Sequence, residues 1–202
     1  MARAKTAATA AALNSSTVTV NSATLELVAE EEPVTEALSL LRRDHRVIER
    51  LFGEFEDAIG HQVDPLARRI CKMLTLHAQI EEELFYPSVR MVMDPLLIDA
   101  ALAEHAELKL QIRHIEAMTS QHPEFAAAMR ALSRGIAAHV VEEETVLFPR
   151  LPGTRLNLEA LGIALAERKE TLMEVMGLHE DDELRATADT ASSDVVRPMT
   201  RQ

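Results

Sequence analysis

Two short stretches of the chain repeat a pattern that can bind a metal ion. In one, His77 is followed four residues later by Glu81; in the other, His139 stands in the same relation to Glu143, and a proline ends each stretch. Residues four apart lie one above the other on a single face of a helix. Each pair can therefore offer an imidazole nitrogen and a carboxylate oxygen to the same ion.

The repeat extends to the residues before each stretch. The dipeptide Asp44-His45 corresponds to the dipeptide Glu104-His105. The chain is thus predicted to contain two helical hairpins, each with one lone histidine and one His-x-x-x-Glu pair, as expected of a duplicated site. The predicted hairpins run from Thr35 to Tyr86 and from Asp94 to Phe148.

Four segments with the period of an amphipathic helix carry these residues on their apolar faces. Asp64 and Asp94, each followed by proline, are predicted to be the N-caps of the second and third segments. Pro87 and Pro149 are predicted to end the second and fourth. We expect the helices at about Thr35 to Ile59, Asp64 to Phe85, Asp94 to Ser120 and Pro123 to Phe148. Short connections between helices of similar length predict an antiparallel four-helix bundle.

The composition supports an all-α fold with one main domain. The 202 residues include 47% hydrophobic but only 3% aromatic residues, 6 glycines and no tryptophan, which is typical of helices. A fifth helix is expected from about Asn157 to Met176, where it could cap the bundle or mediate dimerisation. The predicted division is a disordered leader at 1–33, the bundle at 34–151, the additional helix at 152–178 and a disordered tail at 179–202.

Charge and cysteine usage narrow the partners and the location. A net charge of −12 disfavours nucleic acid and anionic membrane surfaces as partners. The chain also lacks an apolar run of about 18 residues that could span a bilayer. Cys71 is the only cysteine, so no internal disulfide can form and a reducing cytoplasm is expected.

The apolar faces of the four helices each hold one histidine, and two of them also hold a glutamate. An ionised carboxylate without a partner is strongly disfavoured in such a core, and no lysine or arginine lies on these faces. We therefore expect two metal ions; imidazole and carboxylate ligands without cysteine suit iron, with manganese as an alternative. If both glutamates bridge and an oxo or hydroxo group joins the ions, each ion keeps one position for a small molecule. The predicted ligands are His45, His77, Glu81, His105, His139 and Glu143.

Other chemically capable residues are given simpler roles. Packing is favoured over a redox role for Tyr86, and no role is expected for Cys71. A solvated face is expected for Glu82, Glu83, Glu142 and Glu144, one of which could hold a ligand in place. Exposure is expected for His61, His114, His122 and His179.

Over about Ala37 to Arg150, the order of the six residues resembles that of the hemerythrin-like domains, also called HHE cation-binding domains. The resemblance implies an up-down-up-down bundle around a non-haem di-iron centre with bridging glutamates. The ferritin-like bundles, the nearest alternative, use Glu-x-x-His instead. Lys109 stands where the oxygen-carrying members have a further histidine, so the resemblance implies a centre with an open position on both irons.

The function implied is reaction with, or sensing of, a small oxidant in a stress response: oxygen, hydrogen peroxide or nitric oxide. Enzymatic turnover, as peroxide decomposition or an oxidase-type reaction, stays an open question. The ligand set also resembles that of bacterial proteins that repair iron-sulfur centres, although their paired N-terminal cysteines are not found before Cys71. It further resembles an iron-sensing domain of a ubiquitin-ligase adaptor. The alternatives are therefore iron storage or sensing without turnover, iron-sulfur repair, and an interaction module whose fifth helix or acidic tail recruits a partner.

Overall fold

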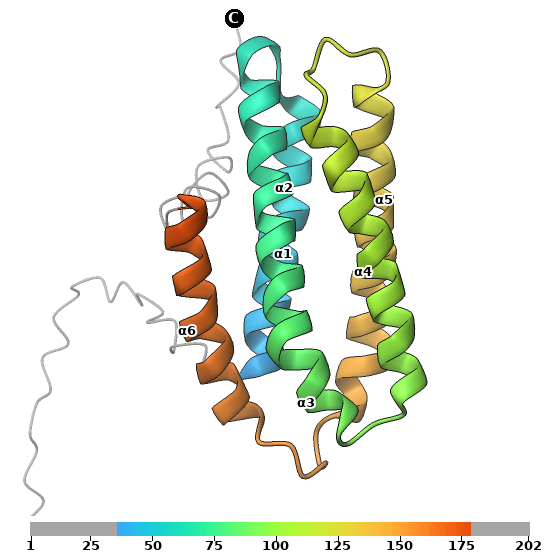
Figure 1. The fold of residues 1–202 in the computed structure, drawn as a ribbon, viewed down its shortest axis with the longest axis vertical. Helices are drawn as coiled ribbons and strands as arrows, with labels where there is room; N and C mark the ends of the chain where they lie inside the picture. Colours follow the sequence, from blue (N-terminus) through green and yellow to red (C-terminus); the bar gives the residue numbers. More distant parts are fainter. Residues whose placement is uncertain (1–35, 179–202) are drawn as a thin grey trace, which may run out of the picture. The chain divides into compact units, whose positions relative to one another are not determined.

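The computed structural model describes residues 36–178, and every regular element in this range is helical (Figure 1). The α-helices are α1 Ala37–Asp57, α2 Val63–Ile80, α3 Tyr86–Arg90, α4 Pro95–Glu116, α5 Phe125–Glu142 and α6 Leu158–Met176. A 3-10 turn, η1 (Gly60–Gln62), connects α1 to α2. The predicted leader at 1–33, the predicted tail at 179–202, and Thr35 lie outside the described residues.

The helices form two antiparallel hairpins packed side by side, as Figure 1 shows. One hairpin is α1 with α2 and its extension α3; the other is α4 with α5. The additional helix α6 lies along α1 and α2. The prediction of an all-α, antiparallel four-helix bundle with an extra C-terminal helix is therefore confirmed.

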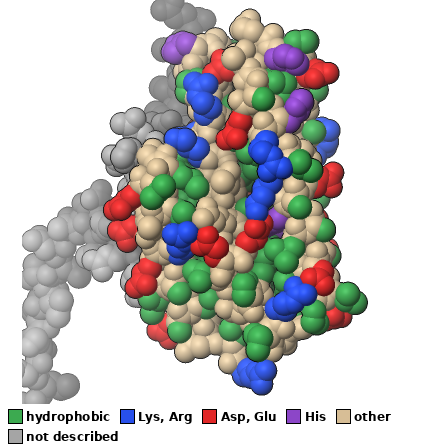
Figure 2. Space-filling model, viewed as in Figure 1, with side chains coloured by type: hydrophobic (Ala, Val, Ile, Leu, Met, Phe, Trp, Pro, Cys, Tyr) green, Lys and Arg blue, Asp and Glu red, His purple; other side chains and the backbone are tan. Residues whose placement is uncertain are grey.

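The outer surface carries both signs of charge. On the face seen in Figure 2, basic and acidic side chains are interspersed among apolar ones. Among the helices of residues 36–178, none is both long enough and apolar enough to cross a membrane.

The two predicted aspartate N-caps behave differently. Asp94 caps α4, since its Oδ1 accepts from the Leu96 backbone N–H at 3.0 Å. The prediction for Asp64 is wrong, because α2 begins one residue earlier. The Asp64 carboxylate instead accepts from the backbone N–H of Ser120 at 2.8 Å and from its hydroxyl at 2.7 Å. These two hydrogen bonds link the start of α2 to the connection between α4 and α5.

The second and fourth helices do not end before their prolines. α2 passes into a π-helical segment, η2 (Glu81–Phe85), and then into α3, which contains Pro87. α5 passes into a second π-helical segment, η3 (Glu143–Leu147), and then into a 3-10 turn, η4 (Phe148–Arg150), which contains Pro149. Each proline falls in the first turn of a new segment, where its missing N–H is not needed. The predicted helix ends are therefore too early.

The π turns change which side chains face the interior. Ordinary α-helical spacing predicts that Leu84 and Val146 lie on the apolar face, yet both are only partly buried. Tyr86 and Phe148 are buried instead, at 1% and 0% exposure. A π turn holds one residue more than an α turn, so these aromatic rings, five positions after Glu81 and Glu143, reach the bundle interior. The first helix was predicted to extend to about Ile59, but α1 ends at Asp57. Ile59 therefore lies beyond the helix and is 76% exposed.

Candidate metal centre

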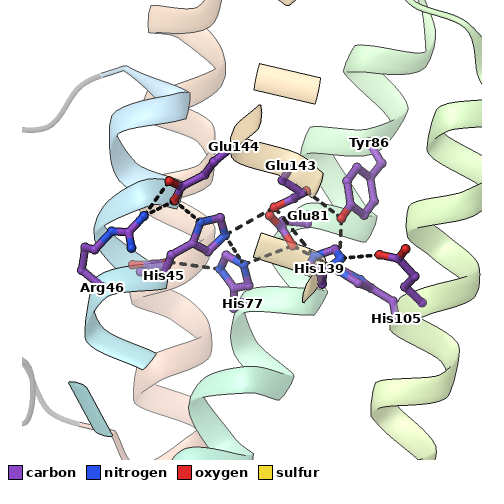
Figure 3. Close-up of polar contacts among 11 residues, drawn as sticks. His45, Arg46, His77, Glu81, Tyr86, His105, His139, Glu143 and Glu144 are labelled. Atoms are coloured by element: carbon purple, nitrogen blue, oxygen red, sulfur yellow. Dashed lines mark hydrogen bonds and ion pairs between the residues drawn. The ribbon is translucent and has the colours of Figure 1, made fainter. Parts of the chain in front are cut away.

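The six residues singled out by the sequence come together in the middle of the bundle (Figure 3). None is more than 2% exposed. Each of the four main bundle helices supplies one imidazole, and the first residue of each π-helical segment supplies a carboxylate. The residues are His45, His77, Glu81, His105, His139 and Glu143.

The four imidazoles form two pairs. The Nε2 atoms of His45 and His77, both in the first hairpin, lie 3.2 Å apart. The Nε2 atoms of His105 and His139, both in the second hairpin, lie 3.0 Å apart. Each hairpin thus presents two ring nitrogens to a common point.

Both glutamates extend between the two pairs. The Oε2 atom of Glu81 lies 3.3 Å from His77 Nε2 and 3.4 Å from His105 Nε2. The Oε2 atom of Glu143 lies 3.3 Å from His45 Nε2 and 3.7 Å from His139 Nε2. Each carboxylate therefore faces one imidazole of each hairpin, and Glu81 belongs to both of the described groups of side chains that could hold a metal ion.

The outward ring nitrogens of the two lone histidines face glutamates that follow the interior ones. His45 Nδ1 lies 2.8 Å from Glu144, and His105 Nδ1 lies 3.0 Å from Glu82. The sequence predicted that one of four neighbouring glutamates has such a role, and the structure finds two, at equivalent places in the repeat.

The other two imidazoles face acids that precede the lone histidines. His139 Nδ1 lies 2.9 Å from Glu104, and His77 Nδ1 lies 3.7 Å from Asp44. Asp44 and Glu104 correspond to each other in the repeat, but no role was predicted for either residue. Their adjacency to the lone histidines was the available signal.

Three of these outer carboxylates lie within hydrogen-bond distance of an imidazole Nδ1 and so determine which ring nitrogen carries a proton. A carboxylate next to Nδ1 favours the tautomer in which Nδ1–H donates and Nε2 keeps its lone pair. In the pair formed by His105 and His139, two Nε2 lone pairs then face each other beside carboxylate oxygens. Such a set of donors without hydrogens repels itself unless a cation lies between them.

The protonation of the interior groups leads to the same requirement. Burial and the charge of Glu143 raise the pKa of Glu81 well above its usual value. Burial and the charge of His139 lower the pKa of His105 to about 4, and burial also lowers the pKa of His77. Both oxygens of Glu81 and the Oε2 atom of Glu143 have no hydrogen-bond partner. The donor set and its unsatisfied buried oxygens therefore fit a bound metal cation.

Three of the four outer carboxylates form ion pairs with basic side chains. Arg46 donates to Glu144 at 2.7 Å, Lys109 forms a close ion pair with Glu82, and Lys169 of α6 lies 2.6 Å from Asp44. Burial opposes the ionisation of Asp44, but Lys169 and His77 outweigh it and lower its pKa. The fourth carboxylate, Glu104, has a 46% exposed side chain and so is stabilised by water.

Tyr86 takes part in the polar network as well as in packing. Its hydroxyl donates to Glu143 Oε1 at 2.9 Å and lies 3.1 Å from His105 Nε2. Burial and the neighbouring carboxylates raise the pKa of the phenol well above its usual value, so it stays a donor. Phe148 occupies the equivalent place in the repeat, where it stacks on His45 with ring centroids 6.0 Å apart.

A cavity of about 10 Å³, room for one water molecule, lies beside the centre. The cavity is lined in part by His77 and His105, one from each hairpin. The remaining walls are mostly apolar, and include Leu74, Leu108, Ile112 and Ile136.

Cys71 and the histidines that were predicted to be exposed lie apart from this cluster. Cys71 is buried, and burial raises the pKa of its thiol to about 12. The predicted exposure of His61, His114 and His122 is confirmed, while His179 lies outside the described residues.

Comparisons with known proteins identify similar chains. Residues 36–151 match the family described as Hemerythrin HHE cation binding domain. A protein of Nostoc named DNA nickase is 33% identical over 110 residues, which is 54% of this chain but only 31% of that relative's length. The crystal structure of a hemerythrin HHE cation binding domain-containing protein from Mycobacterium kansasii is similar with a TM-score of 0.62 at 24% identity, over 75% of this chain and 98% of that one.

Proposed function

Because this chain belongs to the hemerythrin HHE cation-binding domain family, we propose that its buried cluster holds two iron ions that react with, or sense, a small oxidant. The candidates are oxygen, hydrogen peroxide and nitric oxide. The observation that carries the proposal is the pairing: two nitrogen pairs, one from each hairpin, with each of two carboxylates facing both pairs. Manganese is the alternative metal.

The six residues divide naturally between the two ions. His45 and His77 would hold one ion, His105 and His139 the other, and the two glutamates would bridge them together with an oxo or hydroxo group. Ring nitrogens that lie 3.2 and 3.0 Å apart could bind to the same ion, which supports this division. When bound, the ions would supply redox chemistry and Lewis acidity to a small ligand.

The surrounding residues serve that centre in three ways. The outer carboxylates orient the imidazoles and keep Nε2 free of protons. The Tyr86 hydroxyl orients Glu143 by donating to its outer oxygen. The small, mostly apolar cavity beside His77 and His105 would limit the access of bulk water to the centre. Lys109 is held by Glu82 in an ion pair, so it does not act as an additional ligand.

The test is the metal content of the purified protein, with absorption spectra before and after peroxide and after nitric oxide. We expect about two irons per chain and charge-transfer bands of an oxo-bridged pair. His77→Ala should lose iron, whereas His61→Ala, at an exposed histidine, should retain it. No metal, or a single zinc, contradicts the proposal. Two irons that react with none of the three oxidants favour iron storage or sensing without turnover.

The likeness to a DNA nickase covers under a third of that protein. We propose no nucleic acid partner for this chain, since its net charge is −12 and the face seen in Figure 2 mixes both signs of charge. We further propose a cytoplasmic location.

A further inference from the structure

The additional helix α6 lies outside the residues that match the family, yet it contacts the hairpin that holds His45 and His77. Its apolar side, with Leu165 fully buried, packs against α1 and α2. Two consecutive basic residues of α6, Arg168 and Lys169, make ion pairs with acids next to the metal centre.

Lys169 reaches the centre through a single carboxylate. Its Nζ lies 2.6 Å from Asp44 Oδ1, and the two side chains are 12% and 1% exposed. The other oxygen of Asp44, Oδ2, faces His77 Nδ1 at 3.7 Å. Neither of these two atoms has a hydrogen-bond partner, so the contact is electrostatic, and through it α6 reaches one of the interior imidazoles.

Further polar contacts hold α6 in place along α2. Arg168 donates to both carboxylate oxygens of Glu83, at 2.7 and 3.1 Å, and Glu83 lies in the π-helical segment that begins with Glu81. Lys72 of α2 donates to the Met176 carbonyl at the end of α6 at 2.7 Å. A positive charge at the C-terminal end of a helix also interacts favourably with the helix dipole. These two contacts fix the position of α6 and, with it, the position of Lys169 relative to Asp44.

The second hairpin has a different environment at the equivalent points. Glu104, the counterpart of Asp44, has a 46% exposed side chain. Thr145 stands in η3 where Glu83 stands in η2, so this hairpin lacks the acid that Arg168 binds. The exposed side chain of Glu104 thus differs from the buried contact of Asp44 with Lys169.

We infer that α6 controls the affinity of one of the two metal positions, the one formed by His45 and His77, and that Lys169 is the positioning residue through which it acts. The inference rests on the proposed two-ion centre. A carboxylate on Nδ1 orients a metal-binding imidazole and strengthens it as a ligand, and loss of such a partner lowers metal affinity by about 10–100-fold. Through its 2.6 Å contact, Lys169 holds the Asp44 carboxylate in place beside His77. Without it, this partner of His77 is lost.

The coupling works in both directions. If docking of α6 strengthens metal binding at the His45 and His77 position, metal binding there must stabilise the docked helix by the same factor. Occupancy of one metal position is thereby communicated to a surface helix, while the other position is not.

The test is Lys169→Met, with Fe²⁺ affinity measured anaerobically by competition with a chelator in two backgrounds. His105→Ala leaves the position of His45 and His77, where we expect about 10–100-fold weaker binding. His77→Ala leaves the second position, where we expect a change of less than about threefold. Arg134→Met, which removes a positive charge from an exposed site on α5, is the control, and Lys169→Arg should restore affinity. Equal losses in both backgrounds, or no loss in either, overturn the inference.

A measurement on the unmutated chain covers the case in which Lys169→Met does not fold. Hydrogen exchange of the α6 amides should slow when Fe²⁺ is added to the wild type or to His105→Ala, but not to His77→Ala. Exchange in α6 that is indifferent to Fe²⁺ overturns the inference. A wild-type chain that binds fewer than two ions instead contradicts the proposed function.

Discussion

The two halves of the centre match closely on the inside and differ on the outside. Each half has a lone histidine, a His-x-x-x-Glu pair, a π-helical segment that starts at the glutamate, and carboxylates on the outer imidazole nitrogens. Outside this core, Asp44 is buried against Lys169 whereas Glu104 is solvated, and Tyr86 occupies the place that Phe148 has in the other half. The repeat therefore builds two similar metal positions and gives them unequal surroundings.

Removal of an interior glutamate should disrupt both metal positions, because each glutamate faces imidazoles of both halves. Glu143→Ala is expected to lower bound iron from about two per chain to less than one and to reduce thermal stability more than a surface change does. Elemental analysis and thermal unfolding measure the two effects. The adjacent exposed residue provides the control, Glu142→Ala, which should keep full iron content. Full iron content in Glu143→Ala contradicts its assignment as a ligand.

The outer acids should respond unequally to the same substitution. Asp44→Ala removes the buried carboxylate that Lys169 contacts, and we expect it to lower the free energy of unfolding of the metal-free protein by about 3 kcal/mol. Glu104→Ala, at a solvated site, should lower it by less than about 1 kcal/mol. Urea denaturation of both variants checks the difference. Equal losses would mean that the two halves have equivalent surroundings.

Tyr86→Phe should make the two halves more alike. The substitution keeps the ring but removes the donor to Glu143, so we expect the metal-free protein to lose about 1–2 kcal/mol of unfolding free energy. Denaturant unfolding measures this loss. Phe85→Leu, at a neighbouring buried ring outside the polar network, separates packing from hydrogen bonding. Unchanged stability in Tyr86→Phe argues against a hydrogen bond to an ionised Glu143.

The smallest effect is expected far from the centre, where Asp64 ties one hairpin to the other. The hydrogen bonds from Ser120 lower the pKa of Asp64, so they stabilise the folded state only while the carboxylate is ionised. The contribution should be complete above about pH 4, the usual pKa of an aspartate, and should disappear as the pH falls further. Thermal unfolding of wild type and Asp64→Asn should show a difference in Tm at neutral pH that vanishes in acid. A difference independent of pH contradicts this role of the charge.

The sequence was sufficient for the architecture and for the convergence of the six interior residues. Helical periodicity and four-residue spacing are local properties, and the repeat relates one hairpin to the other. The π turns were missed because the residues after Glu81 and Glu143 also suit an α-helix, and only packing in the bundle selects the wider turn. The role of Tyr86 was missed for the same reason, since the π turn brings its hydroxyl to Glu143.

The contacts that distinguish the halves depend on distant parts of the chain. Asp64 reads as an N-cap until the connection after α4 offers Ser120 as a partner. Asp44 and Lys169 are 125 residues apart, and no periodicity links them. Such contacts follow from the packing of whole helices, which local patterns do not determine.

The ion pair between Asp44 and Lys169 has a consequence for the order in which a growing chain can be completed. His45 and His77 are synthesised before His105 and His139. The ion pair next to His77, however, needs a lysine that is synthesised after all of the predicted ligands. On the ribosome, the second hairpin can acquire its outer carboxylates before α6 exists, whereas the first hairpin must wait. The half that is translated first is therefore the last to reach its final form.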